Sequence, residues 1–270
     1  MANIDLVTSV IEAHGGLERY SQLSSITVKF DFTGVLLQLK NQPHHLVVTA
    51  TVSTKEQKVT YVGLGGAADE EWVFTPKRVY KTKNSQVISS LDNPRDTFAE
   101  YKLETPWSDL QFLYFSGYAL WQYFNFPYYL AREDVSAHEI AAHSEAGATW
   151  RVLEVKFPDA NSFASHSQVQ KFYFNDSFQL QRHDYAPEII ASSPAVHYSY
   201  DPITVNGMTF PSLRRVVAAG VGPDGVYLPV SHGPTPTLIN LVFFKVQLNR
   251  QDGEEASAED VWAMTEAPSV

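Results

Sequence analysis

Cysteine is absent from the 270 residues of the chain. This absence excludes disulfides, thiolate metal sites, iron–sulfur clusters and a cysteine nucleophile. Positive charge is also scarce, because 20 Lys and Arg residues face 30 Asp and Glu residues and the net charge is -10. No basic patch interrupts this negative field, so we expect no nucleic acid partner.

Several short motifs are missing as well. The N-terminus has no basic start followed by an apolar run and a cleavage site, which is the pattern of a secretory signal, so we expect a cytoplasmic protein. The chain has no phosphate-binding loop, no dinucleotide-binding glycine pattern and no Gly-x-Ser-x-Gly elbow. The sequence therefore predicts no cofactor and gives no support to serine hydrolase chemistry.

One pair of histidines invites comparison with a zinc site. The zinc-protease motif places two histidines four residues apart on one face of a helix, whereas His138 and His143 are five residues apart. On a strand this spacing directs the two side chains to opposite faces. We therefore expect no metal site, but a surface hairpin that turns at residues 145–147.

Alternation of apolar and polar residues predicts many strands. Ile26, Val28, Phe30 and Phe32 alternate with polar residues, as in a strand with one buried face. Similar runs separated by turn residues are typical of an antiparallel sheet. The predicted strands cover residues 26–32, 46–52, 58–62, 71–74, 78–82, 86–91, 136–142, 150–157, 168–174, 179–185, 196–200, 209–217 and 238–248. The fold class is mainly β (α+β), with one large curved antiparallel sheet or incomplete β-barrel of about eleven to thirteen strands.

Helices are predicted over residues 4–14 and 17–23 and within the stretch 105–130, where the third helix runs from Thr105 to Phe126. The third is the most unusual, because apolar and aromatic side chains surround it on every side. Thr105 is suited to cap this helix and Pro106 to occupy its first position, and it ends before a second proline. A helix that is apolar all round is buried all round, so we expect it to pack in the concave face of the sheet.

A membrane span is the alternative for this helix. Gln111, Gln122 and Asn125 interrupt the apolar run, and the flanking residues are not basic. We therefore expect no stable membrane insertion.

The composition, with 44% hydrophobic and 19% charged residues, is that of an ordinary globular protein. We predict one β-rich ligand-binding domain over residues 1–248 and an acidic tail over residues 249–270. The tail contains six acidic residues and one basic residue, so it is expected to be solvated. A short helical turn at Val261, Trp262 and Met264 is the alternative.

The richest polar cluster lies on three consecutive predicted strands near the C-terminus. A histidine beside a tyrosine or a carboxylate, covered by an apolar lid, is suited to general acid–base catalysis. The candidate catalytic residues are His183, Tyr185, His197, Arg182 and Asp184. The candidate substrate-binding residues are Tyr114, Phe115, Tyr118, Trp121, Tyr123, Tyr198 and Arg214.

Strand alternation places Arg182 and Asp184 on one face and His183 and Tyr185 on the other, but does not show which face is concave. The alternative for the first pair is structural, a cross-strand ion-pair ladder on the solvated face that also includes Arg214 and Arg215. For the histidines and tyrosines of the cluster, namely His183, Tyr185, His197 and Tyr198, the alternative is ordinary packing within the sheet.

Three stretches carry a resemblance to known proteins: residues 13–20 (AHGGLERY), residues 103–107 (LETPW), and residues 171–174 (KFYF) leading into residues 182–185 (RHDY). With these stretches the chain resembles a group of uncharacterised, mostly bacterial proteins, which in turn resemble the LolA-like lipoprotein-carrier superfamily. The resemblance implies an incomplete antiparallel β-barrel with helices in the hollow and an apolar cavity suited to acyl chains or other hydrophobic molecules. It implies no catalytic residues.

The function most favoured by the sequence is binding of a hydrophobic small molecule between sheet and helix, with isomerisation, cyclisation or elimination of that molecule by cofactor-free acid–base catalysis. A non-enzymatic carrier of lipids or other hydrophobic ligands is the first alternative. A structural or interaction module, in which the helix fills the hollow, is the second. The sequence does not separate the three, and it does not predict the oligomeric state.

Overall fold

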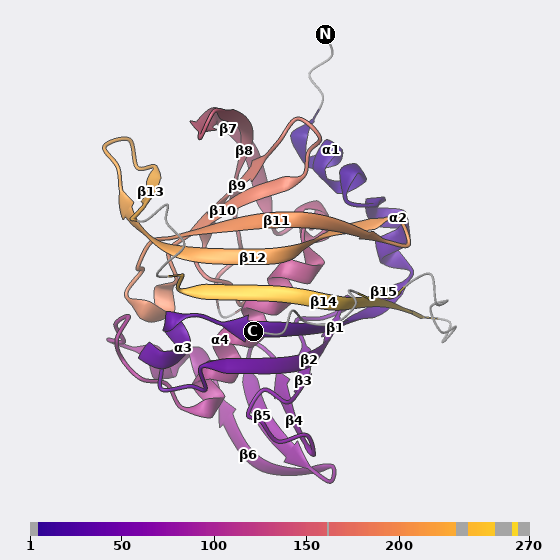
Figure 1. Ribbon diagram of the computed structural model, residues 1–270, viewed down its shortest axis with the longest axis vertical. Helices are drawn as coiled ribbons and strands as arrows, with labels where there is room; N and C mark the ends of the chain where they lie inside the picture. Colours follow the sequence, from indigo (N-terminus) through magenta and orange to yellow (C-terminus); the bar gives the residue numbers. More distant parts are fainter. Residues whose placement is uncertain (1–4, 161, 231–236, 252–260, 264–270) are drawn as a thin grey trace.

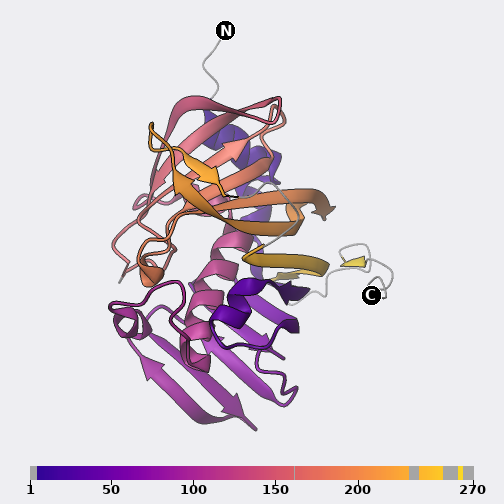
Figure 2. The same cartoon turned by 60° about the vertical axis from the view of Figure 1, so that its left-hand side comes forward.

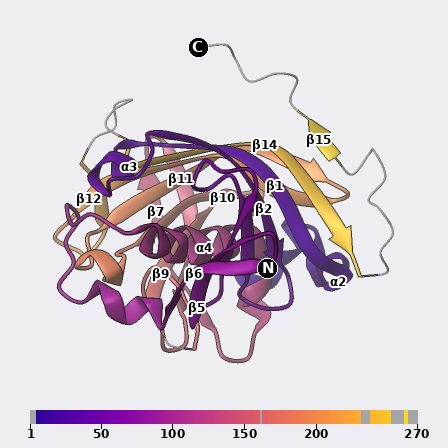
Figure 3. The ribbon, with the colours of Figure 1, turned by 90° about the horizontal axis from the view of Figure 1, so that it is seen from below.

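The computed structural model describes residues 5–160, 162–230, 237–251 and 261–263. These residues form one antiparallel sheet of fifteen strands that arches over a central helix (Figures 1 and 3). The strand order is β6-β5-β4-β3-β2-β1-β14-β12-β11-β10-β9-β8-β7, with β13 paired to β12 and β15 paired to β14. Within the described ranges no pairing joins β6 to β7, so the sheet is open.

Each strand predicted from alternation is present within a few residues. The first group is β1 (Leu23–Thr33), β2 (His45–Ser53), β3 (Val59–Val62), β4 (Glu70–Phe74), β5 (Arg78–Lys83) and β6 (Gln86–Asp92). The second group is β7 (Ser136–Glu145), β8 (Ala148–Lys156), β9 (Val169–Phe174), β10 (Leu180–Tyr185), β11 (Ala195–Val205), β12 (Met208–Val221) and β14 (Ile239–Arg250). The predicted fold class is confirmed.

Two short strands were not predicted. They are β13 (Tyr227–Pro229) and β15 (Val261–Ala263). The second corrects the alternative for the tail, because its backbone pairs with β14 as a strand and does not form a helical turn. β14 itself runs through Arg250, two residues into the predicted tail. The rest of the tail prediction falls on residues 252–260 and 264–270, outside the described residues.

The short helices lie at the ends of strands. The predicted N-terminal pair is α1 (Leu6–Ala13) and α2 (Gly16–Ser21), separated by Gly15 in a left-handed conformation with φ 118°. A Cβ on Gly15 would lie 2.6 Å from the backbone oxygen of Gly207, so glycine is required there. Helix α3 (Val35–Leu39) was not predicted, and 3₁₀ turns occur at Pro94–Phe98, Tyr128–Ala131 and Glu188–Ile190.

The aromatic helix is α4 (Asp109–Asn125), which is shorter than predicted. It begins at a capping box, in which the Ser108 hydroxyl accepts from the Gln111 N–H at 3.3 Å and the Gln111 side-chain oxygen accepts from the Ser108 N–H at 3.0 Å. The predicted cap at Thr105 is wrong, because its hydroxyl accepts from the Lys102 N–H and closes a separate turn. The helix ends at Asn125 with Phe126 as its C-cap, directly before the proline from which its end is predicted.

Helix α4 lies inside the arch, against the concave face, and Figure 2 shows it running lengthwise behind the strands. All its residues from Gln111 to Asn125 are buried, which confirms the prediction from its apolar circumference. A Cβ on Gly117 would lie 2.2 Å from the Phe74 side chain, so the helix packs very closely on β4. No helix among the described residues has the length and apolarity needed to cross a membrane.

Candidate functional site

The predicted polar residues lie on three adjacent strands, β10, β11 and β12. The register pairs His183 with His197 and Ser199 with Arg214. Paired residues of antiparallel strands share a face, and successive residues alternate between faces. The cluster is therefore divided between the two faces of the sheet. His183, Tyr185, His197 and Arg214 lie on the concave face, and Arg182, Asp184 and Tyr198 lie on the convex face.

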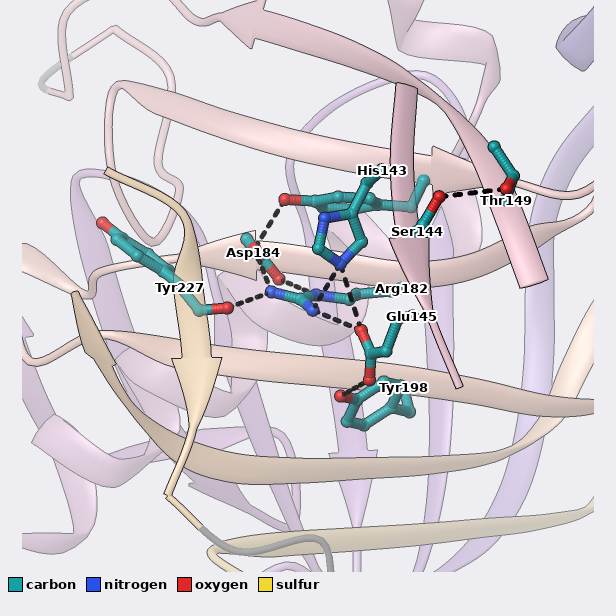
Figure 4. Close-up of polar contacts among 9 residues, drawn as sticks. His143, Ser144, Glu145, Thr149, Arg182, Asp184, Tyr198 and Tyr227 are labelled. Carbon is teal, nitrogen blue, oxygen red and sulfur yellow. Dashed lines mark hydrogen bonds and ion pairs between the residues drawn. The ribbon is translucent and has the colours of Figure 1, made fainter. Parts of the chain in front are cut away.

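The convex cluster (Arg182, Asp184, Glu145, Tyr173 and Tyr198) is a hydrogen-bond network that extends to His143 and to the backbone oxygen of Tyr227 (Figure 4). Arg182 donates through Nε and Nη2 to both carboxylate oxygens of Asp184 at 2.7 Å, and through Nη1 to Glu145 at 2.5 Å. The Tyr173 hydroxyl donates to Asp184 at 2.7 Å, and the Tyr198 hydroxyl donates to Glu145 at 2.5 Å. Each buried charge is thus paired, which is how such charges are held in a stable fold.

The expectation of a solvated ion-pair ladder is wrong. Arg182 and Asp184 are only 1% and 3% exposed, because the β7–β8 hairpin and β13 cover them. Arg214 is not part of this network, since it lies on the opposite face. Arg215 is exposed, as expected.

A β-bulge in β7 brings the end of this strand into contact with the convex cluster. The register of β7 on β8 shifts by one residue between Ile140 and His143. The shift places His143 on the same face as His138, contrary to the expectation of opposite faces. His143 and Glu145 then point towards Arg182, whereas His138 is exposed near Glu154. Among the described residues, no three His, Cys, Asp or Glu side chains are placed so that they could hold a metal ion together.

The concave cluster comprises His166, His183, Tyr185, His197, Tyr123 and Arg214, with α4 above it. The ring of His166 stacks on Tyr185 with 3.9 Å between the ring centres, and its Nε2 lies 3.2 Å from the Tyr123 hydroxyl. The His197 Nδ1 lies 3.5 Å from the Tyr185 hydroxyl. The ring centre of His183 lies 4.6 Å from that of Tyr185, and the His183 Nε2 lies 2.6 Å from the Gln170 side-chain oxygen.

Burial makes the concave cluster neutral except at one residue. It lowers the pKa of His166 to about 3 and holds the pKa values of His183 and His197 well below their usual range. It raises the pKa of Tyr123 to about 12. Burial also lowers the pKa of Arg214, to about 10, so its guanidinium remains charged at neutral pH.

Two small apolar cavities remain in the hollow beside α4. The smaller, of about 20 Å³, is lined by Tyr123, and the larger, of about 40 Å³, is lined by Tyr185. Phe115 and Ile239 line both cavities and separate them. Ligand pockets usually span about 300 to 1,000 Å³, so both cavities are far smaller than such a pocket in this conformation.

Two larger hollows lie elsewhere. One, of about 310 Å³, lies between α2 and the ends of β12 and β14 and has a mainly polar lining. The other, of about 250 Å³, adjoins Asp184 on the convex face and has a mixed lining that includes the charged residues Glu154 and Lys171. Charged residues thus line both of these hollows, in contrast to the two apolar cavities beside α4.

The predicted substrate-binding aromatic residues of α4 do not share one surface. Phe115 and Tyr123 line the cavities, and Tyr118 packs on His166 between them. Tyr114 instead faces Phe74 on β4, and Trp121 donates to the backbone oxygens of the β2–β3 turn. These side chains point in different directions because they lie at different positions around the helix.

Sequence reasoning missed His166 and Gln170. His166 lies in the irregular segment before β9, and Gln170 lies on β9 with its side chain 1% exposed. Gln170 could have been found from the sequence, because strand alternation places this polar residue on the inward face of β9 with Phe172 and Phe174. No periodic signal existed for His166.

Comparison with solved structures supports the fold. A DUF1329 family protein from Desulfovibrio piger is similar with a TM-score of 0.50 and 9% identity, over 92% of this chain and 95% of the other. A LolA superfamily protein from Nitrosomonas europaea has a TM-score of 0.41 and 11% identity, over 90% and 93% of the two chains. A putative outer membrane lipoprotein-sorting protein domain from Vibrio parahaemolyticus has a TM-score of 0.39 and 10% identity, over the same shares. The similarity to the DUF1329 family protein supports the predicted fold. No protein-family model and no curated protein matches the chain.

Proposed function

We propose that the chain binds a hydrophobic small molecule between the concave face of the sheet and α4, and that it acts as a carrier of that molecule. The observation that carries this proposal is the pair of apolar cavities on either side of Phe115. They are the unfilled part of a core that α4 otherwise occupies completely. Displacement of the Phe115 ring joins them into one site.

The mouth of this site lies at one end of the arch. Pro187, Ile190, Ser193 and Pro194, from the segment between β10 and β11, line the larger cavity together with Leu36 of α3. Loops are the elements that open at the lowest free-energy cost. We therefore place ligand entry between this segment and α3.

Cofactor-free acid–base catalysis, the finer prediction from the sequence, has less support than carriage. A general acid or base works best when its pKa is near the working pH. Burial holds the pKa values of His183 and His197 well below their usual range, so both are weak bases in this conformation. Arg182 and Asp184 lie on the other face of the sheet and have no access to the cavities.

Calorimetric titration with 1-decanol tests the proposal. Ala218 of β12 lines the larger cavity, and its neighbour Ala219 points to the opposite face. We expect the protein to bind 1-decanol and Ala218→Phe to weaken that binding by about tenfold or more, since the larger side chain fills the site. Ala219→Phe is the matched control and should bind as the parent does.

Two results would overturn the proposal. The first is a parent protein that binds neither 1-decanol nor its ten-carbon carboxylate and phosphate analogues, which would favour the filled-core interaction module. The second is an Ala218→Phe variant that folds and binds 1-decanol with unchanged affinity, which would place the ligand elsewhere.

A further inference from the structure

Arg214 is a buried guanidinium without a carboxylate partner in the described part of the chain. Arg214 is only 2% exposed to solvent. Its two contacts are long, at 3.4 Å from Nη1 to the Ser199 hydroxyl and at 3.4 Å from Nη2 to the backbone oxygen of Tyr123. The Nε atom is buried and has no hydrogen-bond partner. Arg182, by contrast, is held by two carboxylates.

This arrangement is costly for the free protein. A buried charge loses its hydration, and the fold normally compensates with an ion pair or with several short hydrogen bonds. The ring of Tyr123 lies 4.7 Å from the guanidinium carbon of Arg214 and compensates only in part. An unpaired buried donor in a core is rare, so this one calls for a specific explanation.

Arg214 lies directly behind the walls of both cavities. Tyr123, whose ring covers the guanidinium, lines the smaller cavity, and so does Leu241, which pairs with Arg214 across β12 and β14. Val216, two residues along β12 on the same face, lines the larger cavity. A turn of the Tyr123 side chain connects the apolar space to the guanidinium.

We infer that Arg214 binds the oxyanion headgroup of the ligand, so that the carried molecule is a hydrophobic acid with an apolar body and one carboxylate or phosphate group. This inference rests on the proposed function and names the chemical class of its ligand. The apolar body occupies the joined cavities beside Phe115. The headgroup occupies the side of Arg214 that carries the unpartnered Nε.

The neighbouring groups suit an oxyanion. A guanidinium donates two parallel hydrogen bonds to a carboxylate or phosphate, and such charge-assisted bonds are roughly twice as strong as neutral ones. The Nε2 of His197 is also buried without a partner, so its neutral imidazole offers one more N–H donor. The described residues bring no acidic side chain to this cluster to compete with the ligand.

The test compares three probes that share one chain and differ in the headgroup: 1-decanol, decanoic acid and decyl phosphate. Each is titrated at neutral pH into the parent, into Arg214→Met and into Arg215→Met by calorimetry. Arg215 is the matched control, because it is the next residue, is exposed and points to the convex face.

We expect the parent to bind at least one of the acids about tenfold or more tighter than 1-decanol. Arg214→Met should abolish this preference and retain 1-decanol binding, and Arg215→Met should behave as the parent. The tighter of the two acids identifies the headgroup. If Arg214→Met does not fold, Arg214→Gln makes the same comparison with a polar side chain.

Equal affinity of the parent for all three probes would overturn this inference and leave the proposed function intact. A preference for acids that survives in Arg214→Met or Arg214→Gln would overturn it as well. Absence of binding by all three probes would instead contradict the proposed function.

Discussion

The guanidinium groups of Arg182 and Arg214 are buried to nearly the same extent on opposite faces of one sheet. Arg182 has two carboxylates within 2.7 Å. Arg214 has, within the described residues, one hydroxyl and one backbone oxygen at 3.4 Å. Arg182 is therefore one partner of a buried ion pair, whereas Arg214 is a buried charge without such a partner among the described residues. Replacement of these two arginines should have opposite effects on the stability of the protein.

Removal of Arg182 should be strongly destabilising. Arg182→Met leaves Asp184 and Glu145 buried or half-buried without their cation, and loss of one partner of a buried pair costs about 3 to 5 kcal/mol. We expect a decrease of this size in the free energy of unfolding, measured by urea denaturation. A decrease below about 1 kcal/mol would mean that the network is solvated and behaves as a surface ion pair.

Removal of Arg214 should not be destabilising. Arg214→Met replaces an unpaired buried charge with an apolar side chain of similar length, a change that is often neutral or stabilising by about 1 to 4 kcal/mol. The same urea denaturation, on protein freed of ligand, should give an unfolding free energy equal to or above that of the parent. A large loss of stability would assign Arg214 a structural role and not a ligand-binding one.

Stability should fall as the pH is lowered from about 7 to about 4. His14 and His166 are buried, and burial lowers the pKa of His14 to about 4 and that of His166 to about 3. Below the usual histidine pKa of 6.5 the unfolded chain binds protons that the native state does not, so acidification favours unfolding. Each such histidine contributes about 1.4 kcal/mol per pH unit in this range.

Urea denaturation at pH 7, 6 and 5 measures this slope. His14→Gln removes one of the titrating groups, so it should make the slope shallower by about one proton per molecule. An unfolding free energy that stays constant over this range would show that the histidines are solvated in the native state.

Gly117 should not tolerate a larger residue, although it lies within a helix. Alanine favours an isolated helix by about 1 kcal/mol over glycine. A Cβ at this position, however, would lie 2.2 Å from Phe74 Cγ, and overpacking of this kind costs about 1 to 3 kcal/mol. We expect Gly117→Ala to lower the melting temperature of the protein.

Gly220→Ala is the matched control for Gly117→Ala, because an added Cβ there has no atom within 4 Å. It should leave the melting temperature unchanged. A Gly117→Ala protein that is more stable than the parent would mean that α4 is not seated against β4.

Most of the sheet could be predicted from the sequence, because strand alternation is a local signal. The inward residues of β1, such as Ile26, Val28 and Phe30, are buried and their neighbours are not. The burial of α4 was equally readable from its apolar circumference. Short elements gave no such signal, since α3 has five residues and β13 has three, which is too few for the helical or the strand period to repeat twice.

The candidate site could be predicted only in part. Alternation correctly separated His183 from Arg182, but it could not show that the β7–β8 hairpin folds over Arg182. That contact depends on the bulge before His143, a one-residue shift in register that a single sequence does not encode locally. The role of His166 depends on tertiary packing of an irregular segment, and the sequence carries no period there.

Native mass spectrometry tests most directly whether the hollow beside α4 holds a hydrophobic ligand. The purified parent protein and Ala218→Phe are measured before and after mild organic extraction. We expect a discrete bound mass of a few hundred daltons on the parent, lost on extraction and absent from Ala218→Phe. A bare parent mass, combined with no binding of 1-decanol, decanoic acid or decyl phosphate, would mean that the hollow holds no such ligand.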